Sequence, residues 1–197
     1  MKHFNAGNVW GRVLELKQES STNGTPYLMI SLDCAGKHGT VRAYGRLFGK
    51  EKTENLVDFH EDHPGAMLRF RGYVGQYTKE GTADILTNFT FYAWEEAPGQ
   101  TARAAFVLVG EVTDIAAIGD RWRVNLHLSR EGKGNRDNQE EDFCLWGIDG
   151  SLFEGMLKGQ LVELKGYMQQ GEGEDDFGTA SGEVLPIVKR SRIVVGF

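Results

Sequence analysis

Alternation of apolar and polar residues is the dominant pattern along the first half of the chain. Leu28, Ile30 and Leu32 alternate with other residues, and so do Val41, Ala43 and Gly45, and Leu68, Phe70, Gly72 and Val74. This two-residue period is typical of strands with one buried face. The pattern predicts strands near 8–16, 27–34, 38–47, 66–77 and 83–92. Between the third and fourth of these, residues 50–59 fit a short helix with Leu56 and Phe59 facing inward.

The second half repeats this order of elements. Its pattern predicts strands near 105–115, 121–129, 140–147, 160–169 and 183–195, with a short helix near 149–157. Three short motifs of the first half have counterparts in the same order, at offsets of about 94–102 residues. The pairs are Val9–Val13 with Leu108–Val112, Val41–Gly45 with Phe143–Gly147, and Leu68–Val74 with Val162–Met168. Ordered self-similarity of this kind indicates a duplicated structural unit.

Five strands with a helix between the third and fourth is the element order of the OB-fold, a small Greek-key barrel. We therefore predict an all-β chain with two tandem OB-fold barrels, at residues 1–97 and 104–197. Pro98-Gly99-Gln100-Thr101-Ala102 is the predicted linker. The alternative is one β-sandwich of about ten strands, and the internal repeat favours two barrels.

Short motifs recur at corresponding places in the two halves. In the second half these are Phe143–Gly147 and, after the helix, Leu157–Gly166. In the first half they are Tyr44-Gly45-Arg46-Leu47 and Arg69-Phe70-Arg71-Gly72. These motifs resemble the bacterial and phage-type single-stranded DNA-binding protein family. The resemblance implies an OB-fold that binds single-stranded DNA without base preference, with the aromatic residue before the glycine stacked on a base. The matching aromatics are Tyr44 and Trp146.

The chain also departs from that family. The family has one OB-fold per chain and usually an acidic tail tipped by Phe, which recruits partners. Here two folds are predicted, and the sequence ends Ile193-Val194-Val195-Gly196-Phe197 without acids. The resemblance is therefore to the variant in which two chains, rather than four, supply the folds.

The outward strand positions of the first half gather arginines and aromatics. If the apolar alternation faces inward, the outward residues are Trp10, Arg12, Tyr27, Arg42, Tyr44, Arg46, Arg69, Arg71, Tyr73 and Tyr77. Arginines suit phosphates, and aromatic rings stack on bases of any identity. We predict that these residues bind single-stranded DNA. The alternative is that they form an ordinary solvated strand face, stabilised by cross-strand pairs.

Charge separates the two halves. The 197-residue chain has a net charge of −6. Residues 1–97 hold 11 basic and 12 acidic side chains, whereas residues 104–197 with Arg103 hold 11 and 16. The second fold is therefore expected to bind DNA weakly, through Arg121, Arg123, Trp146 and Tyr167, or to serve association.

No motif predicts a catalytic residue, a cofactor or a metal site. His60-Glu61-Asp62-His63 is the densest ligand-like cluster, and its loop context favours solvation. Without a signal peptide or a long apolar run, we expect a cytoplasmic protein that does not contact membranes. Expected partners are single-stranded DNA or RNA, a second copy in a homodimer, and replication or recombination proteins. The main alternative is an OB-fold protein–protein module of a replication, conjugation or secretion assembly.

Overall fold

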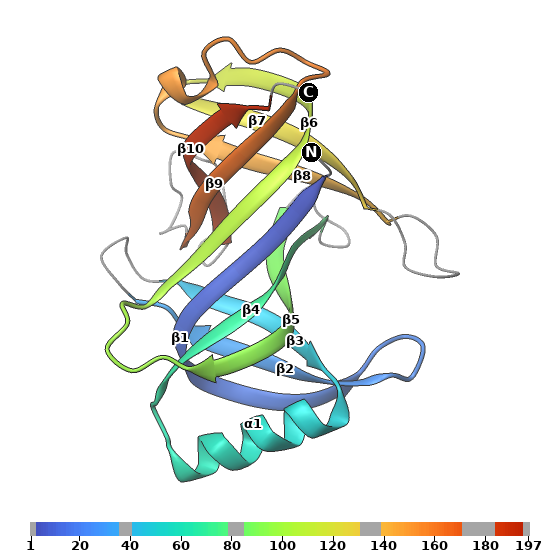
Figure 1. Cartoon of the computed structure of the whole chain (residues 1–197), viewed down its shortest axis with the longest axis vertical. Helices are drawn as coiled ribbons and strands as arrows, with labels where there is room; N and C mark the ends of the chain where they lie inside the picture. Colours follow the sequence, from blue (N-terminus) through green and yellow to red (C-terminus); the bar gives the residue numbers. More distant parts are fainter. Residues whose placement is uncertain (1–2, 36–40, 79–84, 131–138, 171–183, 195–197) are drawn as a thin grey trace.

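The computed structural model describes residues 3–35, 41–78, 85–130, 139–170 and 184–194. Ten strands and one α-helix account for most of them (Figure 1). The strands are β1 (Phe4–Ser20), β2 (Pro26–Asp33), β3 (Arg42–Phe48), β4 (Met67–Thr78), β5 (Ile85–Glu96), β6 (Arg103–Ile118), β7 (Arg121–Arg130), β8 (Gln139–Gly147), β9 (Leu161–Gln170) and β10 (Val184–Ile193). They match the ten predicted strands, with ends shifted by a few residues. Four predicted ends lie outside the described residues: the starts of β3 at 38, of β5 at 83 and of β10 at 183, and the end of β10 at 195.

The first five strands close into a barrel. Their order is β2-β3-β5-β4-β1, and β1 also pairs with β2, which completes the ring. Strands β3 and β5 run parallel, whereas the other neighbours run antiparallel. This is the OB-fold arrangement, and we refer to it as barrel 1.

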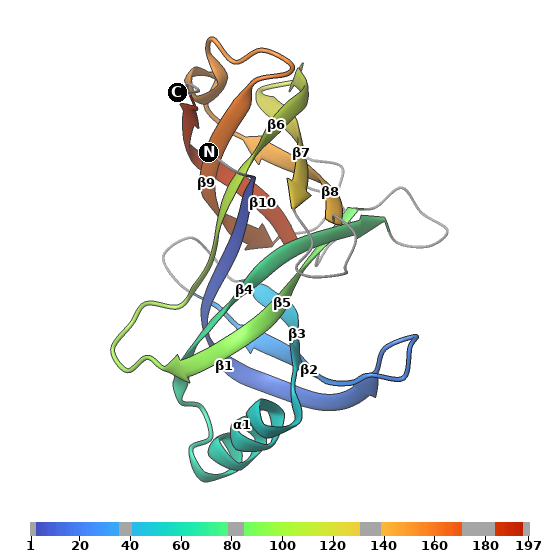
Figure 2. The ribbon, with the colours of Figure 1, turned by 45° about the vertical axis from the view of Figure 1, so that its right-hand side comes forward.

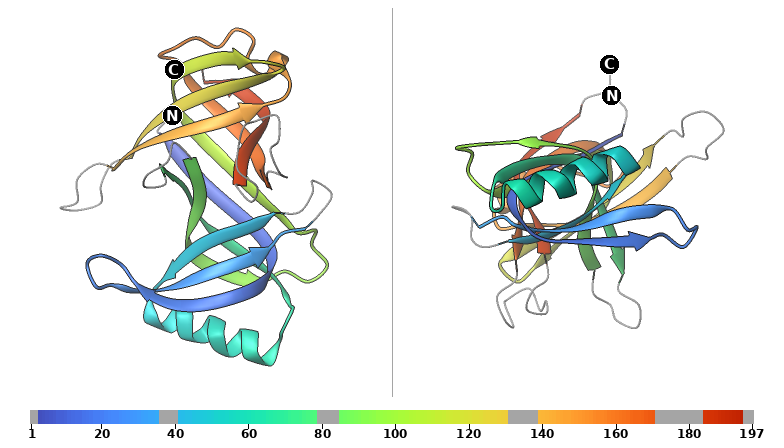
Figure 3. Two further views of the ribbon diagram at one scale, coloured as in Figure 1. Left: turned by 180° about the vertical axis from the view of Figure 1, so that it is seen from behind. Right: turned by 90° about the horizontal axis from the view of Figure 1, so that it is seen from below.

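The helix α1 (Lys50–Asp62) spans the connection between β3 and β4 and lies across one end of barrel 1 (Figure 3). It forms there because one side of it is apolar: Leu56 is fully buried, and the Phe59 ring packs on Trp94 with centroids 5.4 Å apart. The chain enters it through Gly49, whose φ of 103° suits glycine. The predicted helix and its inward residues are confirmed.

The last five strands form barrel 2 with the equivalent order. The sequence of neighbours is β6-β7-β8-β10-β9, the additional pairing β6–β9 closes the ring, and β8 runs parallel to β10. The helix predicted near 149–157 is reduced to a four-residue 3₁₀ turn, η1 (Gly150–Phe153). The predicted length of this helix was therefore wrong. Gly155 has a φ of 76°, in the left-handed region, and this ends any helical continuation.

One antiparallel pairing joins the barrels. Strand β1 pairs with β6 from Phe4 opposite Val109 to Trp10 opposite Arg103. All ten strands thus belong to one continuous sheet that curls twice (Figure 2). The alternative of a β-sandwich is wrong, because each half of the sheet closes on itself. The predicted linker lies between β5 and β6, and the division into domains 1–97 and 104–197 stays a prediction.

The core of each barrel is built from the predicted inward positions. In barrel 1 these include Val9, Leu28, Ile30, Ala43 and Phe70, all at most 1% exposed. A Cβ at Gly45 would collide with the Phe91 ring, and one at Gly147 would collide with the Phe153 ring. The glycine that follows each aromatic therefore makes room for a core ring. No helix among the described residues is long and apolar enough to cross a membrane.

Candidate nucleic-acid interface

The outward residues of β1, β2 and β3 form a regular grid, which we call the β3 face. Strand pairing places them in rows across the three strands. From one end to the other the rows are Arg12–Asp33–Arg42, Glu15–Ser31–Tyr44, Lys17–Met29–Arg46 and Glu19–Tyr27–Phe48. The curvature of β1 around the barrel makes this possible, because β1 leaves β4 near Arg12 and then follows β2.

Strand β3 supplies the most accessible part of this grid. Arg42, Tyr44 and Arg46 are exposed at alternate positions, and Tyr44 retains 41% of its surface. Their inward neighbours Ala43 and Gly45 are buried, which fixes the three side chains outward. Alternate residues on a strand repeat at about 6.6–6.8 Å. A ring thus lies between two guanidinium groups, as contact with a base and its flanking phosphates requires.

Tyr27 lies on the outer side of β2, as predicted, but its ring is covered there. Only 9% of its surface is exposed. Its hydroxyl donates a hydrogen bond of 2.8 Å to Glu19, its ring packs on Phe48 with centroids 5.3 Å apart, and the Arg46 guanidinium lies 5.4 Å above it. The hydrogen bond raises the pKa of Tyr27. Tyr27 therefore supports Arg46 rather than presenting a free ring.

Trp10 sits at the junction of the barrels, flanked by cations. The guanidinium of Arg69 on β4 lies 5.0 Å from the centre of its ring, and that of Arg103 on β6 lies 4.2 Å from it. Glu95 pairs with Arg69 at 3.1 Å and with Arg71 at 3.9 Å. Trp10, Arg69 and Arg71 thus lie together, but their groups are engaged with one another. Arg103 was not predicted, because it lies between the predicted linker at 98–102 and the predicted strand at 105–115.

A second set of exposed rings continues around barrel 1 from the β3 face. Tyr73 on β4 and Tyr92 on β5 are exposed, and their rings pack at 5.4 Å. Thr90 lies beside both Arg46 and Tyr73, so β5 bridges β3 and β4 here. Tyr92 was not among the predicted residues. The buried alternation of Thr87, Phe89 and Phe91 was the signal that places it outward.

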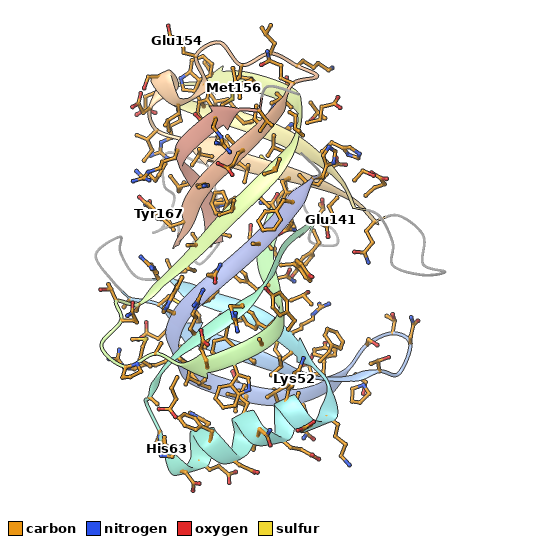
Figure 4. All side chains as sticks on the ribbon, in the orientation of Figure 1. Lys52, His63, Glu141, Glu154, Met156 and Tyr167 are labelled. Atoms are coloured by element: carbon orange, nitrogen blue, oxygen red, sulfur yellow. The ribbon has the colours of Figure 1, made fainter. Side chains whose placement is uncertain are left out.

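The four residues predicted on barrel 2 do not form one surface. Arg121 and Arg123 on β7 pair with Asp120 at 3.7 Å and Asp114 at 3.3 Å. Trp146 on β8 lies opposite Arg123 and is half-buried. Tyr167 belongs to β9, on another side of the barrel (Figure 4), where the Lys189 ammonium lies 5.2 Å from its ring.

A histidine on β7, His127, contacts two carboxylates at the acidic end of β8, and it was not among the predicted residues. His127 Nδ1 lies 2.8 Å from Asp142 and Nε2 lies 2.8 Å from Glu140. Carboxylates only accept hydrogen bonds, so both contacts are satisfied when the ring carries two protons. The hydrogen bond with Asp142, the larger cause, and the one with Glu140 raise the pKa of His127. When the ring is protonated, its charge offsets part of the negative charge of β8.

Histidine, cysteine and carboxylate side chains are the groups that metal binding or nucleophilic chemistry would use. No group of three or more His, Cys, Asp and Glu side chains is arranged there to hold a metal ion. His63 stacks on Phe59 at 4.5 Å. Cys34 and Cys144 are both free thiols, and burial raises the pKa of Cys34 to about 12. A thiol with this pKa is a poor nucleophile.

Comparisons with known proteins show the fold. No family model matches the chain, and no curated protein matches it by sequence. Among solved structures, it is similar to the single-stranded DNA binding protein from Thermus aquaticus, with a TM-score of 0.65 and 14% identity over 100% of this chain and 96% of that chain. A deletion mutant of the same Thermus aquaticus protein gives a TM-score of 0.64 and 14% identity, over 100% of this chain and 97% of that one. The likeness spans both barrels.

Proposed function

We propose that the chain binds single-stranded DNA without base preference, mainly through the β3 face of barrel 1. The observation that carries the proposal is the exposed Arg42–Tyr44–Arg46 column on the third strand of an OB barrel. Arginine guanidinium groups suit phosphates, and a tyrosine ring stacks on any base. The whole-chain likeness to the Thermus aquaticus single-stranded DNA binding protein supports the same ligand.

Charge segregation supports this assignment to barrel 1. The chain as a whole is acidic, with a net charge of −6. On the β3 face, however, the four cations Arg12, Lys17, Arg42 and Arg46 outnumber the three acids Glu15, Glu19 and Asp33, and Lys17 pairs with Glu19 at 2.7 Å. A strand that follows β3 therefore meets cations at both ends of Tyr44.

Other residues of the two barrels have supporting roles in this proposal. Tyr73 and Tyr92 would extend the path around β4 and β5, since Thr90 links them to Arg46. Arg69 and Arg71 would contribute positive charge, whereas Trp10 would not offer an open ring, because two guanidinium groups flank it. Barrel 2 would bind more weakly, because Arg121 and Arg123 are paired with aspartates and β8 is acidic.

The wider role we propose is protection of exposed strands during DNA replication, recombination or repair. We further propose a cytoplasmic homodimer formed of two-domain chains. The end of β10 supports association, because Ile193 is exposed there. Size-exclusion chromatography with light scattering tests the dimer directly.

The test is a titration of a fluorescently labelled oligo-dT of roughly 30 nucleotides, followed by anisotropy at several salt concentrations, with duplex DNA as the control. OB-folds cover about 4–16 nucleotides each, so this length spans both barrels. We expect saturable binding to the single strand that weakens with salt. The logarithm of the binding constant should fall with the logarithm of the salt concentration, with a slope of about −0.7 per phosphate neutralised. Arg42→Ala and Arg46→Ala should each flatten that slope.

Tyr44→Ala separates the proposal from general electrostatic attraction. Loss of one stacked base costs roughly 1–3 kcal/mol, which weakens binding about 5- to 150-fold. The matched control is Tyr27→Phe, which keeps a buried ring and removes only the hydrogen bond to Glu19, and it should bind like the wild type. If the single strand and the duplex bind equally, or if Tyr44→Ala has no effect, the proposal is wrong.

The second candidate function is a protein–protein interaction module built on barrel 2. The observation that favours it is the exposure of aliphatic side chains there, including Ile148 at 51% and Leu157 at 64%. Two results together would favour this second function. The protein would bind no DNA, and it would bind a partner protein that the Leu157→Asp variant no longer binds.

A further inference from the structure

A cleft of about 770 Å³ lies between the two barrels. One wall comes from the ends of β4 and β5 in barrel 1, including Gln76, Tyr77 and Ile85. The other comes from the outer face of β7 and β8 in barrel 2, including Arg123 and Asn125. Its volume falls in the roughly 300–1,000 Å³ range of sites for small ligands. The acidic end of β8, where Figure 4 labels Glu141, borders it.

The walls of this cleft are fixed to each other. The Gln76 side chain accepts from the Cys144 amide at 2.7 Å and donates to the Cys144 carbonyl at 3.0 Å, as a neighbouring strand would. It also donates to the Thr87 hydroxyl at 3.1 Å. Tyr77 follows Gln76 directly, so its place against barrel 2 is set by this contact. A preformed site binds without the cost of ordering its walls.

Polar groups in the barrel 2 wall lack partners among the described residues. The side-chain oxygen of Asn125 and Nε of Arg123 are buried and make no hydrogen bond there. Nη2 of Arg123 is paired with Asp114 at 3.3 Å, which holds the guanidinium in place. Buried polar atoms are usually hydrogen-bonded. A ligand that brings a hydrogen-bond donor for Asn125 and an acceptor for Arg123 would satisfy both.

A nucleotide carries both groups, together with a flat ring. All four DNA bases carry an N–H donor, and the phosphate is an acceptor. Tyr77 is 49% exposed at the opposite wall and offers a ring for stacking. Glu140, Glu141 and Asp142 also line the cleft. Glu140 and Asp142 are engaged with His127, and Glu141 accepts a hydrogen bond from Asn5, so a phosphate would lie at the Arg123 end.

We propose that this cleft binds one nucleotide of the same single strand, stacked on Tyr77 of barrel 1 and hydrogen-bonded by Asn125 and Arg123 of barrel 2. The inference rests on the proposed function. It goes further in making the two barrels act as one continuous binding surface, because neither barrel supplies this site alone. Binding to the β3 face would then raise the local concentration of strand at the cleft.

The experiment compares two oligo-dT lengths on the full chain, by anisotropy. An oligonucleotide of about 8 nucleotides fits one OB-fold, whereas one of about 30 reaches both. Tyr77→Ala and Asn125→Ala should bind the short strand like the wild type and the long strand roughly 5- to 150-fold more weakly. Tyr77→Phe keeps the ring and should bind both lengths normally. A series of oligonucleotides is also made, each with one photoreactive 5-iodouracil at a different position. At least one of them should crosslink to Tyr77.

The outcomes separate this inference from the proposed function. If the wild-type protein binds neither oligonucleotide, the proposed function itself is wrong. A second outcome would overturn only the proposal for the cleft. In it Tyr44→Ala binds both oligonucleotides more weakly, Tyr77→Ala and Asn125→Ala bind both like the wild type, and no crosslink to Tyr77 forms. Binding of a lysine-rich peptide would also overturn only that proposal, if Tyr77→Ala abolishes it while leaving the affinity for the long strand intact. Thermal unfolding of each variant close to that of the wild type shows that the fold is retained.

Discussion

Loss of the Asn5 side chain should weaken the junction of the barrels. Asn5 is only 3% exposed, its amide donates to the Val74 carbonyl at 2.7 Å and to Glu141 at 3.1 Å, and its oxygen accepts from the Val74 amide at 2.9 Å. One amide thus joins β1 and β4 of barrel 1 to β8 of barrel 2. Asn5→Ala removes all three hydrogen bonds at once.

The expected magnitude follows from Val74, which is 2% exposed. Its amide and its carbonyl would both be left buried without a partner, at about 1–3 kcal/mol each. The free energy of unfolding should therefore fall by about 2–6 kcal/mol. For a chain of this length, each kcal/mol lowers Tm by about 2–4 °C, so a decrease of at least about 4 °C is expected.

The assay is differential scanning calorimetry of the full chain at neutral pH. The matched control is Asn8→Ala on the same strand, because Asn8 is half-buried and accepts one hydrogen bond, from Arg69 at 2.9 Å. Its loss should cost roughly 0.5–1.5 kcal/mol. A Tm of Asn5→Ala within about 2 °C of the wild type, or a decrease no larger than that of Asn8→Ala, would refute the reasoning.

Two further predictions concern groups whose pKa the fold shifts. The raised pKa of His127 means that its ion pairs stabilise the fold fully below the ordinary pKa of about 6.5 and that this stabilisation is lost as pH rises through the folded pKa. An NMR titration of His127 should give a pKa above 6.5 that decreases in Asp142→Asn, and an unchanged value in that variant contradicts the assignment. Cys34, with its pKa near 12, should not react with a thiol reagent at pH 8 until the chain is unfolded. In Cys144→Ser protein a rapid reaction of one thiol before denaturant is added would show that Cys34 is accessible.

The strand pattern could be predicted from sequence because each barrel strand buries one face. The alternation around Ala43 and Gly45 was enough to place Arg42, Tyr44 and Arg46 outward, and the same logic held for Arg69, Arg71 and Tyr73. These inferences are local, since the direction of a side chain on a strand depends on its neighbours in sequence.

Which outward residues are accessible was decided by contacts distant in sequence. Strand pairing brings Phe48 and Arg46 onto Tyr27, and pairing between the barrels brings Arg103 onto Trp10. Alternation gives the side of a strand but not what covers it. This is why two of the predicted stacking rings are already engaged.

The sequence by itself thus determined the order of the strands and the direction of their side chains, because both follow from a two-residue period. Only the tertiary structure decided that Asn5 and Gln76 tie the barrels together and that Tyr77 faces Asn125 across a cleft. These contacts join residues about 50–140 positions apart, and they depend on how β1 meets β6. The cleft between the barrels exists because two closed barrels are joined by the pairing of β1 with β6, and no local sequence pattern encodes that arrangement.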